Sequence, residues 1–318
     1  MDVTVVLCTY NRCDSLAKAL ESVAASKMPV SVSWNVLVVD NNSKDNTRQV
    51  VEQFSSRFPG RFQYAFEPHP GKSHALNYAI RESNSQILAF MDDDVQVEPD
   101  WLFNLTGALD NPSFSGAGGR IFPERGFIQP AWLAASESYS LAPLAMFDLG
   151  ATACELKEPP FGTNMAFRRE VFARYGDFRI DLGPQPGSEI RSEDTEFGLR
   201  VLRGGERLWY EPSAVVYHAV PRHRVTKAYF VKWWYGKGRG DVREFGAETG
   251  DSVGLFGVPL VLLRRIAVWS ARWLFSFSPA RRFNCKAKVW WLAGEIHESF
   301  AVSRTAARVR ISERQSAP

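Results

Sequence analysis

The sequence lacks the long hydrophobic run that a membrane-spanning helix needs, because none of its 318 residues lie in an uncharged apolar stretch of about 18 residues. Cysteine is also scarce, and the spacing of the four cysteines matches neither a disulfide framework nor a paired-cysteine metal site. We therefore expect a cytoplasmic protein in a reducing compartment. The first apolar run begins at Val3, so we expect no signal peptide. A formal net charge of +3 gives no indication of nucleic-acid binding.

Apolar strands alternate with helical periodicity over the first hundred residues. The predicted strands cover residues 3–7, 36–39, 62–66 and 87–91. Buried strands joined by helices are typical of an α/β protein whose mostly parallel sheet is flanked by helices. Ligands bind such sheets at the carboxyl ends of the strands. Polar residues follow three of these strands, at 9–12, at Asp40 and at 92–94, and they predict a ligand site at one sheet edge.

Three consecutive aspartates, Asp92, Asp93 and Asp94, follow the buried run 87–91. Their carboxylates repel one another unless a positive charge lies among them. A solvated turn is the alternative for such a triplet, but this one is held where a ligand would bind. Mg²⁺ commonly bridges one or two carboxylates to substrate phosphates, and Mn²⁺ suits the same donors. The triplet therefore predicts a divalent metal site for Mn²⁺ or Mg²⁺ that also holds a diphosphate.

An ordered set of segments extends this signal along the chain. The segments are VVLCTYNR (5–12), VVDNNS (38–43), GKSHALN (71–77), FMDDDV (90–95), GTNMAFRR (162–169), SEDTEF (192–197) and YH (217–218). In this order they resemble a family 2 glycosyltransferase and cover residues 3–220. The resemblance implies a GT-A (Rossmann-like) fold. It also implies an inverting enzyme that moves a sugar from a nucleotide-diphosphate sugar to an acceptor hydroxyl.

The resemblance implies that the end of the first strand holds the base and ribose of the donor. The residues concerned are Thr9, Tyr10, Asn11 and Arg12. Asp40 resembles the aspartate that contacts the base, although Asp-Asn-Asn-Ser is also a turn-forming sequence. Lys72 precedes a predicted helix and suits a diphosphate. Asn77 is a further candidate for contact with the nucleotide-sugar donor. The alternative is a structural role on the helix surface.

The metal signature of the family, Asp-x-Asp, maps to Asp92 and Asp94. The resemblance implies that Asp92 touches the ribose or the metal and that Asp94 ligates the metal, while Asp93 can share either role. His218 ends the predicted strand 214–217. The resemblance implies that His218 is an additional ligand of the metal or the diphosphate. The alternative is a structural histidine whose hydrogen bonds are made within the protein.

Asp194 occupies the position of the family's catalytic base, beside Glu193 at the start of a predicted helix. It would take the proton of the acceptor hydroxyl as that oxygen attacks the anomeric carbon, which inverts the configuration. The alternative is an acidic helix start stabilised by the helix dipole. The acceptor side is expected at Gly162, Thr163, Asn164 and Glu193.

These assignments divide the chain into two domains. Residues 1–222 are the predicted GT-A catalytic domain, in which about 1–115 bind the nucleotide sugar and 116–222 supply the acceptor side and the base. Residues 223–318 are predicted to be a helical, basic and Trp-rich extension. Gly236-Lys-Gly-Arg-Gly240 predicts a loop that could close over the donor.

The extension combines arginines, lysines and tryptophans beyond Leu255, with Glu295 and Glu298 as the only acidic residues up to Arg310. Basic, Trp-rich amphipathic helices suit an anionic membrane surface, and a helical cap on the catalytic domain is the alternative. We expect a peripheral protein on the inner face of the membrane with a saccharide or lipid-linked acceptor. Synthesis of a cell-surface polysaccharide or glycolipid follows from this expectation.

Two other functions remain open from the sequence. A nucleotidyltransferase could use the same sheet and acidic metal site, although no glycine-rich nucleotide loop follows the first strand. A non-catalytic nucleotide-sugar-binding module could retain the fold. A glycoside hydrolase would need two opposed carboxylates and no nucleotide.

Overall fold

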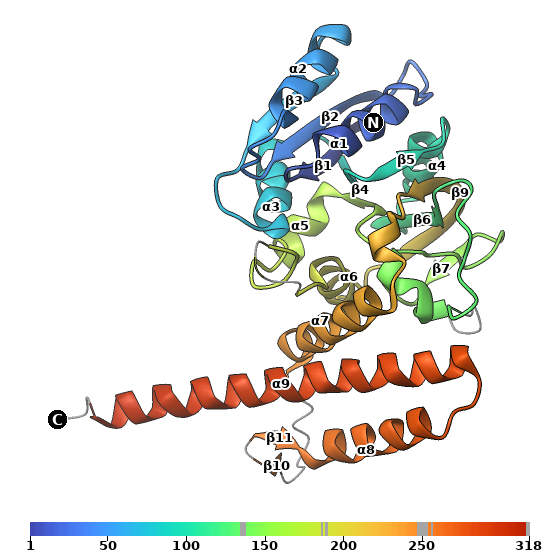
Figure 1. Cartoon of the computed structure of the whole chain (residues 1–318). Helices are drawn as coiled ribbons and strands as arrows, with labels where there is room; N and C mark the ends of the chain where they lie inside the picture. The colour runs from blue at the N-terminus through green and yellow to red at the C-terminus, as the bar shows by residue number, and fades with distance from the viewer. Residues whose placement is uncertain (134–137, 186, 188–189, 247–253, 256, 316–318) are drawn as a thin grey trace. The chain divides into compact units, whose positions relative to one another are not determined.

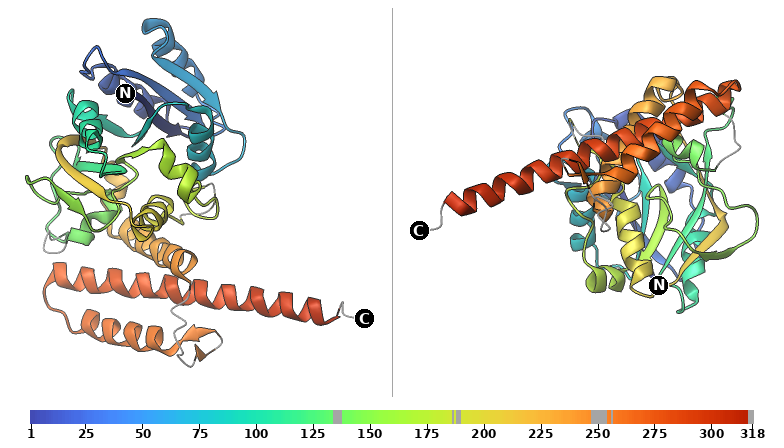
Figure 2. Two further views of the ribbon diagram at one scale, coloured as in Figure 1. Left: turned by 180° about the vertical axis from the view of Figure 1, so that it is seen from behind. Right: turned by 90° about the horizontal axis from the view of Figure 1, so that it is seen from below.

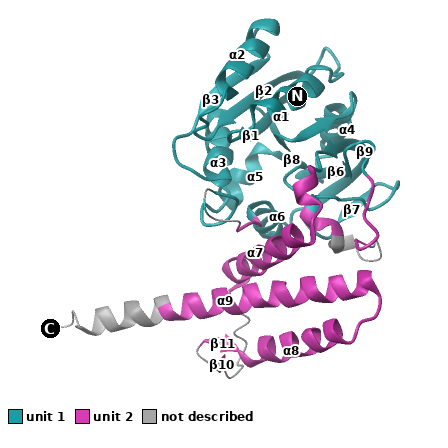
Figure 3. Ribbon diagram, in the orientation of Figure 1, with its two compact units in different colours: residues 1–127, 144–188, 193–220 teal, residues 128–143, 189–192, 221–318 magenta. Residues whose placement is uncertain are grey.

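The computed structural model describes residues 1–133, 138–185, 187, 190–246, 254–255 and 257–315. The chain forms two compact units (Figure 3). The first unit comprises residues 1–127, 144–188 and 193–220, and the second comprises 128–143, 189–192 and 221–318. The second unit starts its main segment close to the predicted boundary at residue 222, but it also includes 128–143 from the predicted catalytic domain. The functional division of the chain stays a prediction.

Within the described residues, the first unit contains a nine-stranded sheet. Its strands are β1 (Asp2–Thr9), β2 (Ser33–Asp40), β3 (Phe62–Phe66), β4 (Ile87–Asp92), β5 (Val95–Val97), β6 (Gly116–Pro123), β7 (Cys154–Leu156), β8 (Asn164–Arg168) and β9 (Leu208–His218). Their order is β3-β2-β1-β4-β8-β6-β9-β5, and β7 pairs with β9 (Figure 1). The strands β1 to β4 are parallel, whereas β8 is antiparallel to β4 and β6. The predicted α/β class with a mostly parallel sheet is confirmed.

Helices cover both faces of this sheet. They are α1 (Cys13–Ala24), α2 (Thr47–Arg57), α3 (Lys72–Glu82), α4 (Trp101–Gly107), α5 (Arg169–Tyr175) and α6 (Glu193–Arg203), with the short 3-10 helix η1 (Ala108–Asp110). The 3-10 helix η2 (Ser138–Leu144) belongs to the second unit except for its last residue. Because side chains alternate along a strand, Val5 and Leu7 of β1 face the core that contains α1, α2 and α4, while Val6 faces α3, α5 and α6. Burial on both faces explains the continuous apolar runs in the sequence.

The strand pairing brings the polar strand ends to one edge. In the parallel ladders, Thr9 lies opposite Asp40 and Cys8 lies opposite Asp92. Because β8 runs antiparallel to β4, its amino end at Asn164 lies opposite Met91 at the carboxyl end of β4. The pairing of β5 with β9 places His218 opposite Val95. Segments far apart in the sequence therefore meet beside the three aspartates.

Some predicted boundaries differ from the structure. The predicted strand 214–217 is part of the longer strand β9, which begins at Leu208. The register against β6 shifts so that Gly119 pairs with Glu211 and Arg120 with Val215. This irregularity accommodates Pro212, which lacks the N–H donor that a regular ladder needs. The three-residue strands β5 and β7 are too short to produce a detectable alternation in the sequence.

The second unit contains η3 (Arg222–Arg224), α7 (Lys227–Phe245), α8 (Leu260–Leu274), α9 (Pro279–Gln315) and the strand pair β10 (Gly254–Leu255) and β11 (Val258–Pro259). Both α7 and α8 pack against α9, which lies between them in Figures 1 and 2. In the part of the chain that the structure describes, no helix has both the length and the apolar character to cross a bilayer.

The predicted glycine loop 236–240 is wrong, because this segment lies inside α7. A Cβ at Gly238 would overlap the backbone carbonyl of Trp291, and a Cβ at Gly294 would overlap the carbonyl of Tyr235. The two glycines therefore allow α7 and α9 to approach each other closely from both sides. In this sequence the glycines mark a helix crossing, and local composition could not distinguish that from a loop.

We expect Gly238→Ala to lower the free energy of unfolding by about 1–3 kcal/mol, because the added methyl group must separate α7 from the Trp291 carbonyl. Chemical denaturation followed by circular dichroism measures this change. Gly107→Ala is the matched control, since a Cβ there meets no atom within 4 Å and the substitution adds a better helix former at the end of α4. Equal stabilities for the two variants would contradict the close-packing explanation.

Candidate active site

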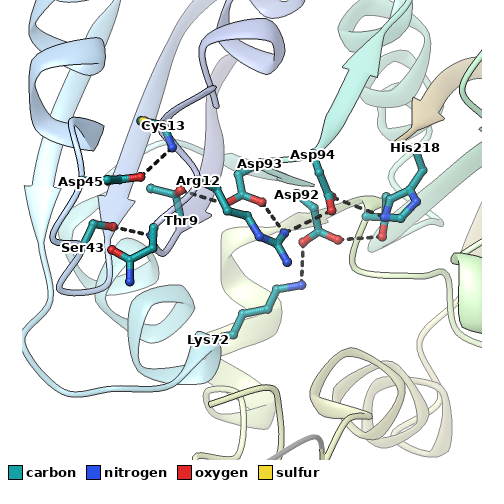
Figure 4. Close-up of polar contacts among 12 residues, drawn as sticks. Thr9, Arg12, Cys13, Ser43, Asp45, Lys72, Asp92, Asp93, Asp94 and His218 are labelled. Carbon is teal, nitrogen blue, oxygen red and sulfur yellow. Dashed lines mark hydrogen bonds and ion pairs between the residues drawn. The ribbon is translucent and has the colours of Figure 1, made fainter. Parts of the chain in front are cut away.

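The three aspartates of the acidic tip, Asp92 to Asp94, begin at the end of β4 and continue into the turn before β5. Each carboxylate has its own set of partners (Figure 4). The Oδ2 atom of Asp93 accepts a 2.8 Å hydrogen bond from the buried hydroxyl of Thr9. Arg12 donates from Nη1 to Asp93 Oδ1 at 2.8 Å and to Asp94 Oδ2 at 3.1 Å. The guanidinium of Arg12 thus supplies the positive charge that the triplet requires.

Burial and the two neighbouring charges all shift the pKa of Asp93. Burial raises the pKa of Asp93 to about 6, while the guanidinium of Arg12 opposes that change and the carboxylate of Asp94 adds to it. Thr9 and Arg12, both predicted to contact the donor, therefore hold the acidic tip in place.

Asp94 and His218 form the pair closest to the predicted metal site. The Oδ1 atom of Asp94 lies 3.3 Å from Nε2 of His218, and both side chains are buried. The backbone carbonyl of Asp94 also accepts a 2.9 Å hydrogen bond from the N–H of Ala219. No group of three or more His, Cys, Asp or Glu side chains that could hold an ion is found among the described residues. The carboxylate of Asp94 nevertheless supplies an oxygen donor of the kind that Mn²⁺ and Mg²⁺ prefer, and these ions take further ligands from phosphates and water.

Asp92 belongs to a second ionic cluster, which also contains Lys72 and Glu193. Lys72 Nζ lies 2.6 Å from Asp92 Oδ1 and 3.5 Å from Glu193 Oε1. Thr163 donates its hydroxyl to Asp92 Oδ2 at 2.8 Å. Burial lowers the pKa of Lys72, but the surrounding carboxylates outweigh it and the net pKa is raised, so the ammonium stays charged. Protein carboxylates therefore hold the lysine that was predicted to bind the diphosphate.

Asp194 lies in the first turn of α6, beside Glu193. Its Oδ2 atom accepts a 2.6 Å hydrogen bond from the backbone N–H of Gly162, and its Oδ1 atom accepts one of 2.8 Å from Thr195. A Cβ at Gly162 would lie 3.0 Å from Asp194 Oδ2, so glycine allows this close approach. Burial raises the pKa of Glu193, and the neighbouring charge of Asp194 adds to it. The structure thus joins the predicted base to the predicted acceptor segment 162–164.

The predicted nucleotide side consists of cross-linked strand ends. The buried Asp40 accepts hydrogen bonds from the N–H of Ser43 at 2.8 Å and the hydroxyl of Tyr64 at 2.9 Å. Asn11 has a positive φ of 52° and accepts from the N–H of Lys44 at 2.7 Å. Tyr10 is exposed. These bonds tie the loops after β1 and β2 together, and Tyr10 is the aromatic ring that they present to solvent.

Two predicted ligand contacts are not supported by the geometry. Asn77 is buried and exchanges hydrogen bonds of 2.8 and 2.9 Å with the backbone of Phe178. Asn164 is also buried, and its amide donates to two backbone carbonyls while its oxygen accepts from the indole of Trp101. The protein occupies the polar groups of both asparagines, so both side chains link segments of the fold, and their roles as donor and acceptor contacts stay predictions.

Asn41 is a positioning residue that the sequence analysis missed. Its Oδ1 accepts a 2.8 Å hydrogen bond from the N–H of Gly71, and its Nδ2 donates to the carbonyl of His69 at 2.7 Å. Gly71 has a φ of 130°, which other residues rarely adopt. Asn41 therefore fixes the turn that leads into Lys72. An amide next to Asp40 at a strand end was the signal available in the sequence.

The family profile described as "Glycosyl transferase family 2" matches residues 4–176. This match spans the acidic tip and more than half of the chain. The chain belongs to glycosyl transferase family 2. The predicted resemblance is therefore confirmed, and so is the assignment of the protein as a glycosyltransferase.

Two curated relatives and one solved structure illustrate the similarity. The succinoglycan biosynthesis protein ExoM of Rhizobium meliloti is 29% identical over 75% of this chain and 74% of its own length. The glucosyl-dolichyl phosphate glucuronosyltransferase of Haloferax volcanii is 26% identical over 74% of this chain and 75% of its own. The mannosyltransferase PcManGT of Pyrobaculum calidifontis, solved with GDP-Man and Mn²⁺, superposes with a TM-score of 0.57 at 19% identity, covering 99% and 80% of the two chains. This structural likeness confirms the GT-A fold.

Proposed function

We propose that this glycosyltransferase takes a sugar from a nucleotide-diphosphate donor and transfers it to an acceptor hydroxyl with inversion at the anomeric carbon. The observation that carries the proposal is the convergence of the Asp94–His218 pair, the Asp92–Lys72–Glu193 cluster and Asp194 at one sheet edge. Binding of GDP-Man by PcManGT supports a nucleotide-sugar donor. The same edge would supply ligands for a metal, a charged lysine and a general base.

The donor would lie over the loops after β1 and β2. Tyr10, Asn11 and Asp40 would surround the nucleotide, while Thr9 and Arg12 hold the acidic tip in position beneath it. We assign Asp94 and His218 as the metal ligands. The carboxylates of Asp92 and Asp93 would add negative charge around the ion. A bound Mn²⁺ or Mg²⁺ would neutralise the diphosphate and stabilise it as a leaving group.

The acceptor would approach from the side of Gly162, Thr163 and Glu193. Asp194 would accept the proton of the attacking hydroxyl, a general-base contribution of about 10²–10⁴-fold in rate. Its hydrogen bonds from the backbone N–H groups of Gly162 and Thr195 hold the carboxylate in a fixed orientation. Lys72 lies between Asp92 and Glu193, so it would fix the position of the donor-side Asp92 relative to the acceptor-side Glu193.

We further propose a saccharide or lipid-linked acceptor, used in cell-surface polysaccharide or glycolipid synthesis at the cytoplasmic face of a membrane. The similarity to a succinoglycan biosynthesis protein and to a transferase named for a dolichyl phosphate supports this class of acceptor. The basic, Trp-rich second unit supports a peripheral position at the membrane.

A panel of UDP-, GDP- and dTDP-sugars with Mn²⁺ or Mg²⁺ tests the proposal. Release of nucleoside diphosphate that requires the metal and an acceptor is the expected result, and the NMR coupling of the new anomeric proton reports the inversion. Release of pyrophosphate would instead identify a nucleotidyltransferase. Donor binding without turnover across a broad acceptor panel would identify a binding module.

Lys72→Met provides a stability test of the ionic cluster. We expect the free energy of unfolding to fall by about 2 kcal/mol, because the substitution leaves Asp92 and Glu193 without their shared cation. Thermal and urea denaturation measure this loss. Lys157→Met is the matched control: its pair with Glu155 is exposed, so we expect a change below about 0.5 kcal/mol. A loss no larger than that of the control would exclude a positioning role for Lys72.

A further inference from the structure

The helix α8 is apolar on two opposite sides. On one side, Leu262, Ile266 and Trp269 pack with Leu292 and Ile296 of α9. On the other side, exposed residues recur at helical spacing. They are Leu260, Val261, Arg264, Ala267, Val268, Ala271, Arg272 and Leu274. Six of these eight side chains are apolar. This second side, the outer face of α8, has no covering partner among the described residues.

The turn after α8 extends the outer face. Phe275 is 75% exposed and Phe277 is 98% exposed, so neither ring packs against the described protein. The turn leads directly into α9 at Pro279 (Figure 1). Full burial of a phenylalanine side chain is worth about 1.5–3 kcal/mol, so two such rings represent a large gain for any apolar surface that receives them.

The charge around the outer face has one sign. From Leu255 to Gly294 the sequence contains no aspartate or glutamate. It does contain the basic residues Arg264, Arg265, Arg272, Arg281, Arg282, Lys286 and Lys288. The guanidinium of Arg272 lies 4.8 Å from the ring of Trp269, and the ammonium of Lys286 lies 5.6 Å from that of Trp273. Basic groups beside indole rings are typical of the boundary between lipid headgroups and acyl chains.

We propose that the outer face of α8 and the turn 275–277 insert into the surface of an anionic lipid bilayer. The uniform positive charge favours lipid over a second copy of this chain, because a symmetric dimer through this face would bring the same arginines together. Anionic headgroups neutralise them instead. The inference specifies the element that carries the proposed peripheral location and rests on that location, but it does not depend on the catalytic residues.

The experiment measures binding of the full chain to vesicles of phosphatidylcholine, with and without phosphatidylglycerol, by co-sedimentation at low and high salt. We expect binding only to the anionic vesicles, weakened by salt. The double variant Phe275→Ser/Phe277→Ser removes apolar contact, and we expect at least a tenfold loss of affinity. Arg281→Gln/Arg282→Gln removes two charges, and at about fivefold for each charge we expect roughly a 25-fold loss.

Matched controls come from exposed residues of the first unit. Val30→Ser/Phe103→Ser removes exposed apolar side chains and Lys18→Gln/Lys27→Gln removes the same charge elsewhere, and both double variants should leave binding unchanged. Equal loss in variants and controls, or no binding to anionic vesicles at low salt, overturns the proposal. So does a dimer in light scattering that the phenylalanine variant abolishes without any vesicle binding. Nucleoside diphosphate release without vesicles is measured in parallel, so failure of transfer with intact vesicle binding would reject the proposed function alone.

Discussion

Replacing Asp194 with asparagine is expected to lower kcat by about 10²–10⁴-fold while donor affinity stays unchanged. The asparagine has the same size, and its oxygen can still accept the hydrogen bond from Gly162, although its amide nitrogen cannot accept the one from Thr195. The amide cannot take a proton from the acceptor hydroxyl. Steady-state diphosphate release measures the loss, and calorimetric titration with the nucleotide measures donor binding.

Glu170→Gln is the control for the effect of the helix dipole. Glu170 also lies in the first turn of a helix, α5, and removal of its charge alters the dipole interaction without touching the site. We expect this variant to retain full activity. If Asp194→Asn is as active as Glu170→Gln, then Asp194 is only a stabilising helix residue and the base must be sought elsewhere, beginning with Glu193.

Asp94→Asn is expected to lower kcat/KM by about three orders of magnitude, because the metal's stabilisation of the leaving group is worth several kcal/mol. The variant keeps the size of the side chain but removes the charge that faces His218. Electron paramagnetic resonance of free Mn²⁺, in the presence of the nucleotide diphosphate, measures metal binding directly and does not depend on turnover.

Asp93→Asn distinguishes direct ligation of the metal from the general effect of negative charge in the acidic tip. Asp93 contacts Thr9 and Arg12 instead of His218, so we expect a smaller loss of Mn²⁺ affinity than in Asp94→Asn. Equal Mn²⁺ affinity in the wild type and in Asp94→Asn would remove Asp94 as a ligand. A larger loss in Asp93→Asn would shift the metal site by one residue along the tip.

Much of the first unit could be predicted from periodicity alone. The strands β1, β2 and β4 contain buried apolar runs that stand out in the sequence, and their polar ends mark the site. The start of α6 at Glu193 also matches the prediction. These features depend on residues close together in the sequence, where pattern and structure share the same cause.

The features that the sequence could not reveal are contacts between distant residues. Asn77 and Asn164 look like ligand contacts in a motif, but their partners are the backbone of Phe178 and the indole of Trp101. Lys72 meets Asp92 and Glu193 only after the sheet has formed. The glycines of 236–240 serve the crossing of α7 with α9, which composition cannot distinguish from a loop. No local pattern specifies which side chain completes a hydrogen bond in the folded chain.

The antiparallel pairing of β8 with β4 has a consequence for how acceptor preference can change. The last residues of β4 carry the acidic tip, and the first residues of β8 follow Gly162, which holds Asp194. In the proposed reaction, the β4–β8 ladder and Gly162 would therefore set the spacing between leaving group and base. Changes to the connection from β6 to β8 that keep Gly162 and Thr163 would leave this spacing unchanged. Chimeras built in this way should acquire a different acceptor and keep the same donor.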